Sequence, residues 1–150
     1  MNDPPVILEI LANCKTIAVV GLSDHEGRAS YGVSRFMQSR GYRIIPVNPL
    51  IESALGEKAY PNLAAACSAV PSIQLVNVFR APQHIPAIVD EVIRLKIPYL
   101  WLQEGVVDPV AAARAEDAGI KVVMDRCILK ARMAAGWGQA VQADTPSAES

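Results

Sequence analysis

The chain has 150 residues, of which 51% are hydrophobic, 19% charged and 5% aromatic, and its formal net charge is −1. This length suits a single domain, and the apolar fraction is large enough to form one buried core. Because 14 basic side chains nearly balance 15 acidic ones, no overall field attracts nucleic acid or an anionic membrane. Any anion site must therefore be local.

Compartment and targeting follow from the cysteines and the first residues. Cys14, Cys67 and Cys127 are widely spaced and form no C-x-x-C pair, which argues against a disulfide framework and against a thiolate zinc site. The opening segment, residues 1–5, has an acid and two prolines instead of the basic residues of a secretory signal, and no apolar run approaches the ~20 residues of a membrane span. We expect a cytoplasmic protein.

Short apolar runs alternate with longer segments of helical spacing along the chain. A helix over Val6–Ala12 is expected first. The runs are nearly continuously apolar, which is typical of strands covered on both faces. They are Thr16–Val20, Arg43–Val47, Ile73–Phe79, Tyr99–Leu102 and Lys121–Met124. The helices predicted between them are Ser30–Arg40, Asn62–Ser68, Gln83–Lys96 and Asp108–Ala118.

The helix ends carry residues that suit them. Gly41 and Gly119 each follow a predicted helix and precede a strand, as C-terminal cap glycines do. Asp108 before Pro109 is a typical N-cap followed by a proline in the first turn. The apolar stripe of this helix is predicted to include Val110.

Five strands with helices between them predict a doubly wound α/β fold, in which a parallel five-stranded sheet is flanked by helices. Residues 1–139 form the predicted domain, and residues 140–150 are small and polar, as in a flexible C-terminal tail. Ligands of such sheets bind outside the carboxyl ends of the strands, at the switch point of the strand order. The loops after the strands are therefore the candidate site.

The loop after the first strand has the features of an anion site. Gly21 follows the strand directly, and Ser30 is predicted to cap the next helix, where free N–H groups and the helix dipole favour an anion. Arg28 can bind a phosphate with two donors. Ser23 breaks a G-x-G-x-x-G pattern, and no Walker A sequence occurs. An ordinary turn with a solvated arginine is the alternative.

The second strand ends in Val47, Asn48 and Pro49. An NAD-binding unit usually has an acid here for the ribose hydroxyls, whereas Asn48 suits a nucleotide with an extra ribose phosphate. The alternative is a turn-forming Asn-Pro pair without a ligand. After the third strand, Arg80 contacts a phosphate or pairs with a neighbouring acid.

The last two strand ends supply further candidates. Gln103 and Gly105 stand where the amide or backbone of a ligand could approach, whereas Trp101, inside its strand, is predicted to be packed. Cys127 follows Arg126 at a helix start, where a cysteine is either a reactive thiolate or a small buried hydrophobe. No histidine is placed to activate it, so we assign no catalytic residue. Neither histidine has metal-ligand spacing, so we assign no metal.

These segments in this order resemble the small stand-alone CoA-binding proteins of bacteria, which are related to the CoA-binding domain of the succinyl-CoA synthetase alpha subunit. The resemblance covers roughly residues 5–135, and seven weak blocks in register make it specific. The matching blocks are Val20–Ser23, Arg28–Tyr31, Gly41–Pro49, Leu55–Lys58, Val78–Arg80, Trp101–Gly105 and Val123–Cys127.

The resemblance implies a Rossmann-like domain that binds coenzyme A or an acyl-CoA across its strand ends. The pyrophosphate would lie on the Ser23–Ser30 loop, the adenosine half beside the second and third strand ends, and the pantetheine arm beside the last two. The residues that the resemblance assigns to CoA are Gly21, Ser23, Arg28, Ser30, Tyr31, Val47, Asn48, Pro49, Phe79, Arg80, Gln103, Gly105, Asp125, Arg126 and Cys127.

Two departures from the family and two other functions complete the interpretation. Asp24 and Glu26 replace residues that are often prolines, and their charges oppose anion binding. The synthetase domain with the catalytic histidine is absent, so the resemblance implies binding without chemistry.

An NAD(P)- or flavin-dependent oxidoreductase is the first alternative, disfavoured by the missing glycine motif. The second is an interaction module that uses Trp137 and the helix around Ile128–Met133 to bind a protein partner or a second copy.

Overall fold

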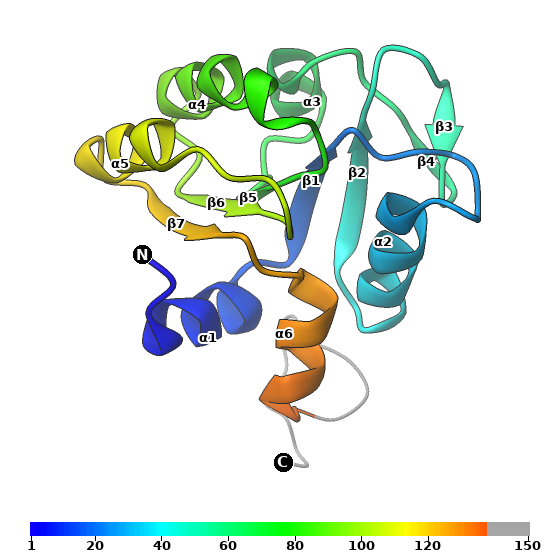
Figure 1. The fold of residues 1–150 in the computed structure, drawn as a ribbon. Helices are drawn as coiled ribbons and strands as arrows, with labels where there is room; N and C mark the ends of the chain where they lie inside the picture. The colour runs from blue at the N-terminus through cyan, green and yellow to red at the C-terminus, as the bar shows by residue number, and fades with distance from the viewer. Residues whose placement is uncertain (138–150) are drawn as a thin grey trace.

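The computed structural model describes residues 1–137 and shows a parallel sheet between two layers of helices (Figure 1). The predicted tail, residues 140–150, lies outside the described residues, as do the last two residues of the predicted domain. The five strands are parallel throughout, in the order β2-β1-β5-β6-β7. They are β1 Thr16–Val20, β2 Arg43–Val47, β5 Leu75–Val78, β6 Tyr99–Leu102 and β7 Lys121–Met124. The Rossmann-like fold class is confirmed, and only the third predicted strand is shorter than expected.

Helices cover both faces of the sheet (Figure 1). Along β1, Ile17 and Val19 pack into one core and Ala18 and Val20 into the other, because successive side chains of a strand point to opposite faces. The helices are α1 Pro4–Asn13, α2 Ala29–Ser39, α3 Leu63–Ala69, α4 Ile85–Arg94, α5 Pro109–Asp117 and α6 Ile128–Ala135, with a short 3-10 turn at Pro82–His84. The first core holds residues of α1, α2 and α6, and the second holds residues of α3, α4 and α5.

The strand order places the switch point between β1 and β5. From β1 the chain passes through α2 to β2 on one side, and it later returns to β5 on the other side of β1. The loops that leave β1 and β5 therefore diverge to opposite faces of the sheet, and a crevice opens between them at the carboxyl edge. No helix in residues 1–137 combines the length and apolar character needed to cross a membrane.

A small hairpin between β2 and α3 was not predicted. Its strands, β3 Ser53–Ala54 and β4 Glu57–Lys58, have two residues each, too few to show an alternating pattern. Leu55 and Gly56 form the turn with φ of 56° and 77°, as expected for a tight hairpin turn. Gln38 of α2 donates through Nε2 to the Leu55 carbonyl oxygen at 2.9 Å and ties the hairpin to the body of the domain.

The predicted stripe of α5 is wrong. Val110 is 81% exposed, and the residues of α5 that face the sheet are Ala111, Ala112 and Ala115. The phase of the helix turns these alanines toward the sheet and leaves Val110 on the outer side. The N-cap prediction is confirmed, since the Asp108 side chain accepts a hydrogen bond from the Ala111 N–H at 3.0 Å.

We predict that Asp108→Ala lowers the free energy of unfolding by about 1 kcal/mol, because it removes the side-chain cap from α5. Urea denaturation followed by circular dichroism measures the change. Asp117→Ala is the matched control at the other end of α5, where an acid opposes the helix dipole, and it should leave stability equal or slightly higher. Equal losses in both variants would contradict the capping role.

A second prediction concerns the thiols. Cys14 is fully buried, and desolvation raises its pKa to about 12, so at pH 8 it holds its proton and is out of reach of reagents. A chromogenic disulfide reagent should leave Cys14 unmodified in the native protein and modify it after unfolding. Mass mapping identifies the labelled residue, and Cys127→Ser removes the half-buried thiol at the start of α6 as a control. Rapid native labelling of Cys14 would contradict the packing described.

Candidate ligand-binding site

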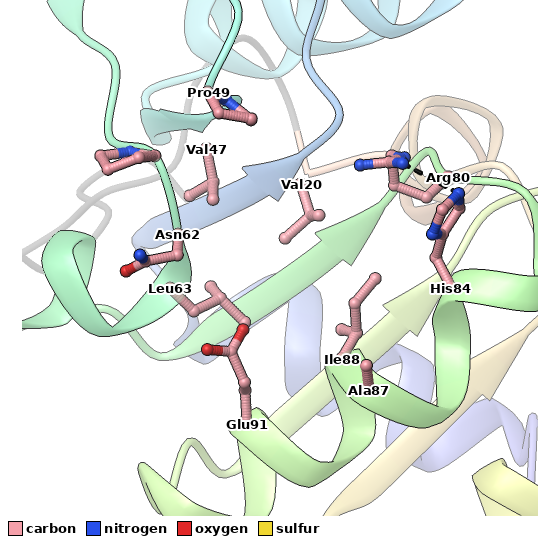
Figure 2. Close-up of a pocket in the computed structure, with 11 residues that line it drawn as sticks. Val20, Val47, Pro49, Asn62, Leu63, Arg80, His84, Ala87, Ile88 and Glu91 are labelled. Carbon is pink, nitrogen blue, oxygen red and sulfur yellow. Dashed lines mark hydrogen bonds between the residues drawn. The ribbon is translucent and has the colours of Figure 1, made fainter.

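A pocket of about 200 Å³ opens at the carboxyl ends of β1, β2 and β5, between α3 and α4, which is the switch point of the sheet (Figure 2). Its floor is apolar and is formed by Val20, Val47, Leu63 and Ile88. The remaining lining residues are Pro49, Pro61, Asn62, Arg80, His84, Ala87 and Glu91. An apolar floor with a few polar groups at the rim is the usual composition of a small-molecule site.

The basic and acidic side chains of this pocket lie on different sides of it. Figure 2 shows Arg80 and His84 on one side of the pocket and Glu91 on another, beyond Ile88. The Glu91 carboxylate lies 3.4 Å from Arg94 of the same helix. Asn62 caps α3, since its Oδ1 accepts from the Ala65 N–H at 2.8 Å. The pocket therefore has a cationic end and an anionic end, joined by an apolar floor.

Gly21 brings the loops after β1 and β5 into direct contact. Its φ is +88°, and a Cβ built on it would lie 2.9 Å from the Phe79 carbonyl oxygen and 2.9 Å from Cδ of Arg80. Only a glycine meets both requirements. Sequence reasoning placed Gly21, Phe79 and Arg80 in one site, and the structure places them together.

Arg80 pairs with a histidine instead of the neighbouring acid that was the predicted alternative to a phosphate. Its Nη2 lies 2.9 Å from Nε2 of His84, which ends the 3-10 turn and precedes α4 (Figure 2). Both side chains are half-buried. The arginine and the histidine are four residues apart, across the turn from β5 into α4.

The first loop is organised differently from the prediction at one position. Arg28, not Ser30, is the N-cap of α2, and it makes no side-chain cap. Ser30 is buried inside the first turn, and its Oγ accepts from the Ser23 N–H at 3.0 Å. Ser30 could not be the cap because its hydroxyl closes the loop back on Ser23, whose own Oγ accepts from the His25 N–H.

The start of α2 keeps free donors. Within residues 1–137 the N–H groups of Ala29 and Ser30 make no hydrogen bond, and Arg28 is exposed. Unpaired N–H groups and the helix dipole together favour an anion at this end. Tyr31 is half-buried beside them, and Asp24 and Glu26 are exposed on the outer part of the loop.

The side chain of Asn48 makes hydrogen bonds to the backbone of two loops. Its Nδ2 donates to the Leu22 carbonyl oxygen at 3.0 Å, and its Oδ1 accepts from the Leu50 N–H at 2.9 Å. The side-chain amide therefore ties the first loop to the second and fixes the turn. Its neighbours Val47 and Pro49 are the residues of this segment that line the pocket.

The loops after β6 and β7 are joined to each other. Gln103 is buried and accepts through Oε1 from the Ile128 N–H at 3.0 Å, while the Gly105 N–H donates to Oδ1 of Asp125 at 2.8 Å. Trp101 is fully buried as predicted, and its Nε1 donates to the Arg126 carbonyl oxygen at 2.8 Å.

These contacts hold the exposed Arg126 and the half-buried Cys127 at the same edge of the sheet as the pocket, although neither residue lines it.

Sequence reasoning missed most of the pocket. Of the predicted residues, only Val47, Pro49 and Arg80 line it. The missed residues are Val20, Pro61, Asn62, Leu63, His84, Ala87, Ile88 and Glu91. The one available signal was the position of His84, close behind Arg80 at the start of a helix that follows a strand end.

Comparisons with known proteins give the family of the chain. A family model described as a CoA binding domain matches residues 15–133. The uncharacterized protein YneT of Bacillus subtilis (strain 168) is 44% identical over 122 residues, which are 81% of this chain and 88% of that protein.

Two solved structures share the fold over nearly the whole chain. A hypothetical protein from Pyrococcus horikoshii OT3 superposes with a TM-score of 0.81 at 30% identity, over 88% of this chain and 91% of that one. A Thermus thermophilus protein, cell-free ID.343, gives 0.80 at 31% identity, over 88% and 98%. With the family match over residues 15–133, these likenesses show that the chain belongs to the CoA-binding domain family.

Proposed function

We propose that this chain binds coenzyme A or an acyl-CoA across the carboxyl edge of its parallel sheet and supplies no catalytic group of its own. The observation that carries the proposal is the pocket at the switch point, with Arg80 on its rim and the free start of α2 nearby. Membership of the CoA-binding domain family supports the ligand class.

The pyrophosphate is assigned to the start of α2. Here the free N–H groups of Ala29 and Ser30 and the exposed guanidinium of Arg28 provide donors of the kind that bind phosphate oxygens. Asp24 and Glu26 lie on the same loop and lower the affinity through like-charge repulsion. Ser23 and Ser30 contribute indirectly, because their side chains hold the loop closed.

The adenosine half is assigned to the pocket, between Val47 and Pro49 on one wall and Ile88 on the other. The apolar floor suits a flat base, since burial of its ring surface is favourable there. Arg80, with its stem held against Gly21, is placed to meet a phosphate on the ribose.

The pantetheine arm is assigned to the joined loops after β6 and β7. The exposed backbone at Gly105 and the side chains of Asp125, Arg126 and Cys127 lie along this edge. Gln103 supports them from below by holding the start of α6. We assign no catalytic role here, because within the described residues no hydrogen bond joins Cys127 to a histidine that could activate it.

Calorimetric titration with CoA, dephospho-CoA and NADP tests the proposal. Saturable binding of CoA, stronger than that of both controls, is the expected result. Absence of heat with millimolar CoA would overturn the proposal. Binding of NADP at least as strong as that of CoA would favour the alternative function, an oxidoreductase.

We predict that Arg28→Ala weakens CoA binding by about 1.5–3 kcal/mol through the loss of a charge-assisted contact. Arg35→Ala is the matched control. Arg35 is exposed two turns further along α2, and its substitution removes the same charge. The same calorimetric titration measures both variants. Equal affinities of the Arg28 variant and the parent would show that the pyrophosphate lies elsewhere.

Gly21→Ala should destabilise the fold by about 1–3 kcal/mol, the usual cost of a left-handed backbone in a residue with a side chain. It should also weaken CoA binding, since the added Cβ displaces the stem of Arg80. Gly32→Ala in α2 is the control, because nothing lies within 4 Å of a Cβ there. Thermal unfolding and CoA titration of both variants measure the effects, and an unchanged Gly21 variant would contradict the close approach.

A further inference from the structure

The contact between Arg80 and His84 determines the state of the histidine. A guanidinium has N–H donors and no acceptor, so the 2.9 Å contact from Arg80 Nη2 requires a lone pair on His84 Nε2. A hydrogen bond from Arg80 across this contact therefore requires the His84 tautomer that has its proton on Nδ1. A proton on Nε2 would place two donors against each other and break the contact.

Few other charges face His84. Its own helix contributes Glu91, which is paired with Arg94. From the remaining walls, β1, β2 and α3 present the uncharged residues Val20, Val47, Pro49, Pro61, Asn62 and Leu63.

Two further groups lie behind these walls. On α3 the thiol of Cys67 is near Glu91, whose charge adds to burial in raising the pKa of Cys67. Arg114 of α5 is engaged by Asp90 and by the Pro86 carbonyl oxygen, which are exposed on α4. Within the described residues, Arg80 is the permanent charge in direct contact with His84.

A phosphate oxygen that binds Arg80 would change the hydrogen bonding at Nε2 of His84. The oxygen would meet the lone pair on His84 Nε2, and two lone pairs repel. When Nε2 takes a proton from solvent, the histidine becomes a second cationic donor, and both side chains can donate to the same phosphate. A phosphomonoester, with a charge between about −1.5 and −2 and three acceptor oxygens, favours this change more than a singly charged diester does.

We propose that Arg80 and His84 form a phosphomonoester site in which His84 takes up a proton as the phosphate binds. The inference rests on the proposed function and deepens it, because it assigns the 3′-phosphate of CoA to this pair. The base then points along the apolar floor toward Glu91 and Asn62, away from the two cationic donors (Figure 2).

Calorimetry with adenosine 3′,5′-bisphosphate and with adenosine 3′,5′-cyclic monophosphate, whose one phosphate is a singly charged diester, tests the proposal at pH 7.5 in buffers of different ionisation enthalpy. The slope of the apparent enthalpy against the buffer enthalpy counts the protons taken up. We expect a fraction of a proton taken up with the bisphosphate and little with the cyclic monophosphate. Binding of the bisphosphate should strengthen as the pH falls from 8 toward 6.5, because the bound state holds more protons than the free state.

His84→Gln keeps a hydrogen-bonding side chain but cannot take up the proton. It should abolish the uptake and weaken bisphosphate binding about tenfold, the loss expected for one hydrogen bond to a charged group. Gln83→Ala is the matched control, since Gln83 is the exposed neighbour of His84 in the same 3-10 turn and is outside the assigned binding residues. Its proton uptake should match that of the parent.

A measurement without substitution complements the variants. In protein labelled with ¹⁵N-histidine, His84 should show the neutral Nδ1–H tautomer in the free state and the cation after the bisphosphate binds. Proton uptake that persists in His84→Gln, or a His84 that stays neutral in the complex, would overturn the inference.

Equal binding of CoA and dephospho-CoA would overturn the phosphate site while CoA binding itself stands. Absence of any CoA binding would overturn both proposals.

Discussion

The close approach of Gly21 to Phe79 and Arg80 is the contact on which the candidate site depends. A parallel sheet with its switch point between β1 and β5 sends the two loops to opposite faces, and a side chain at position 21 would push them apart. With glycine there, the stem of Arg80 lies against the first loop, and its guanidinium reaches His84 at the pocket rim. One backbone position thus sets the distance between the assigned pyrophosphate and adenosine regions.

Around this contact, many polar side chains of the strand-end loops serve the scaffold. The side-chain oxygens of Ser30 and Gln103 accept from backbone N–H groups of another loop or helix start, and Asn48 Oδ1 accepts from the Leu50 N–H of its own turn. Buried or half-buried polar groups need such partners, and the partners in turn fix the loops. The groups left for a ligand are therefore backbone donors at the start of α2 and the cationic side chains of Arg28 and Arg80.

The separation of charges in the pocket would orient an anionic nucleotide bound there. Arg80 and His84 occupy one side and Glu91 another, with Val20 and Ile88 between them. An anionic group is attracted to the first side and repelled from the second, so a nucleotide with a phosphate on its ribose has one favourable orientation. The apolar floor would bury the base, and the charges of Arg80 and Glu91 at the rim would favour the phosphate on the side of Arg80.

The sequence alone determined the layers and the strands of this protein. Continuous apolar runs such as Thr16–Val20 identify strands buried on both faces, and the intervening helices leave a doubly wound sheet as the natural fold. The fold class was therefore predictable, and the order of the strand-end segments also indicated the CoA-binding family. Residues with one strong local role, such as Asp108 as a cap, were also predictable.

Only the tertiary structure decided which side chains line the pocket. Sequence position cannot show that Ser30 bonds to Ser23, because that hydrogen bond depends on how the loop closes. Nor can it show that His84 meets Arg80, or that Asn62 and Glu91 border the same pocket, since these residues come from separate elements. A strand pattern reports burial along one segment, whereas a pocket is formed by the distances between segments, and those distances exist only after the sheet and its helices have packed.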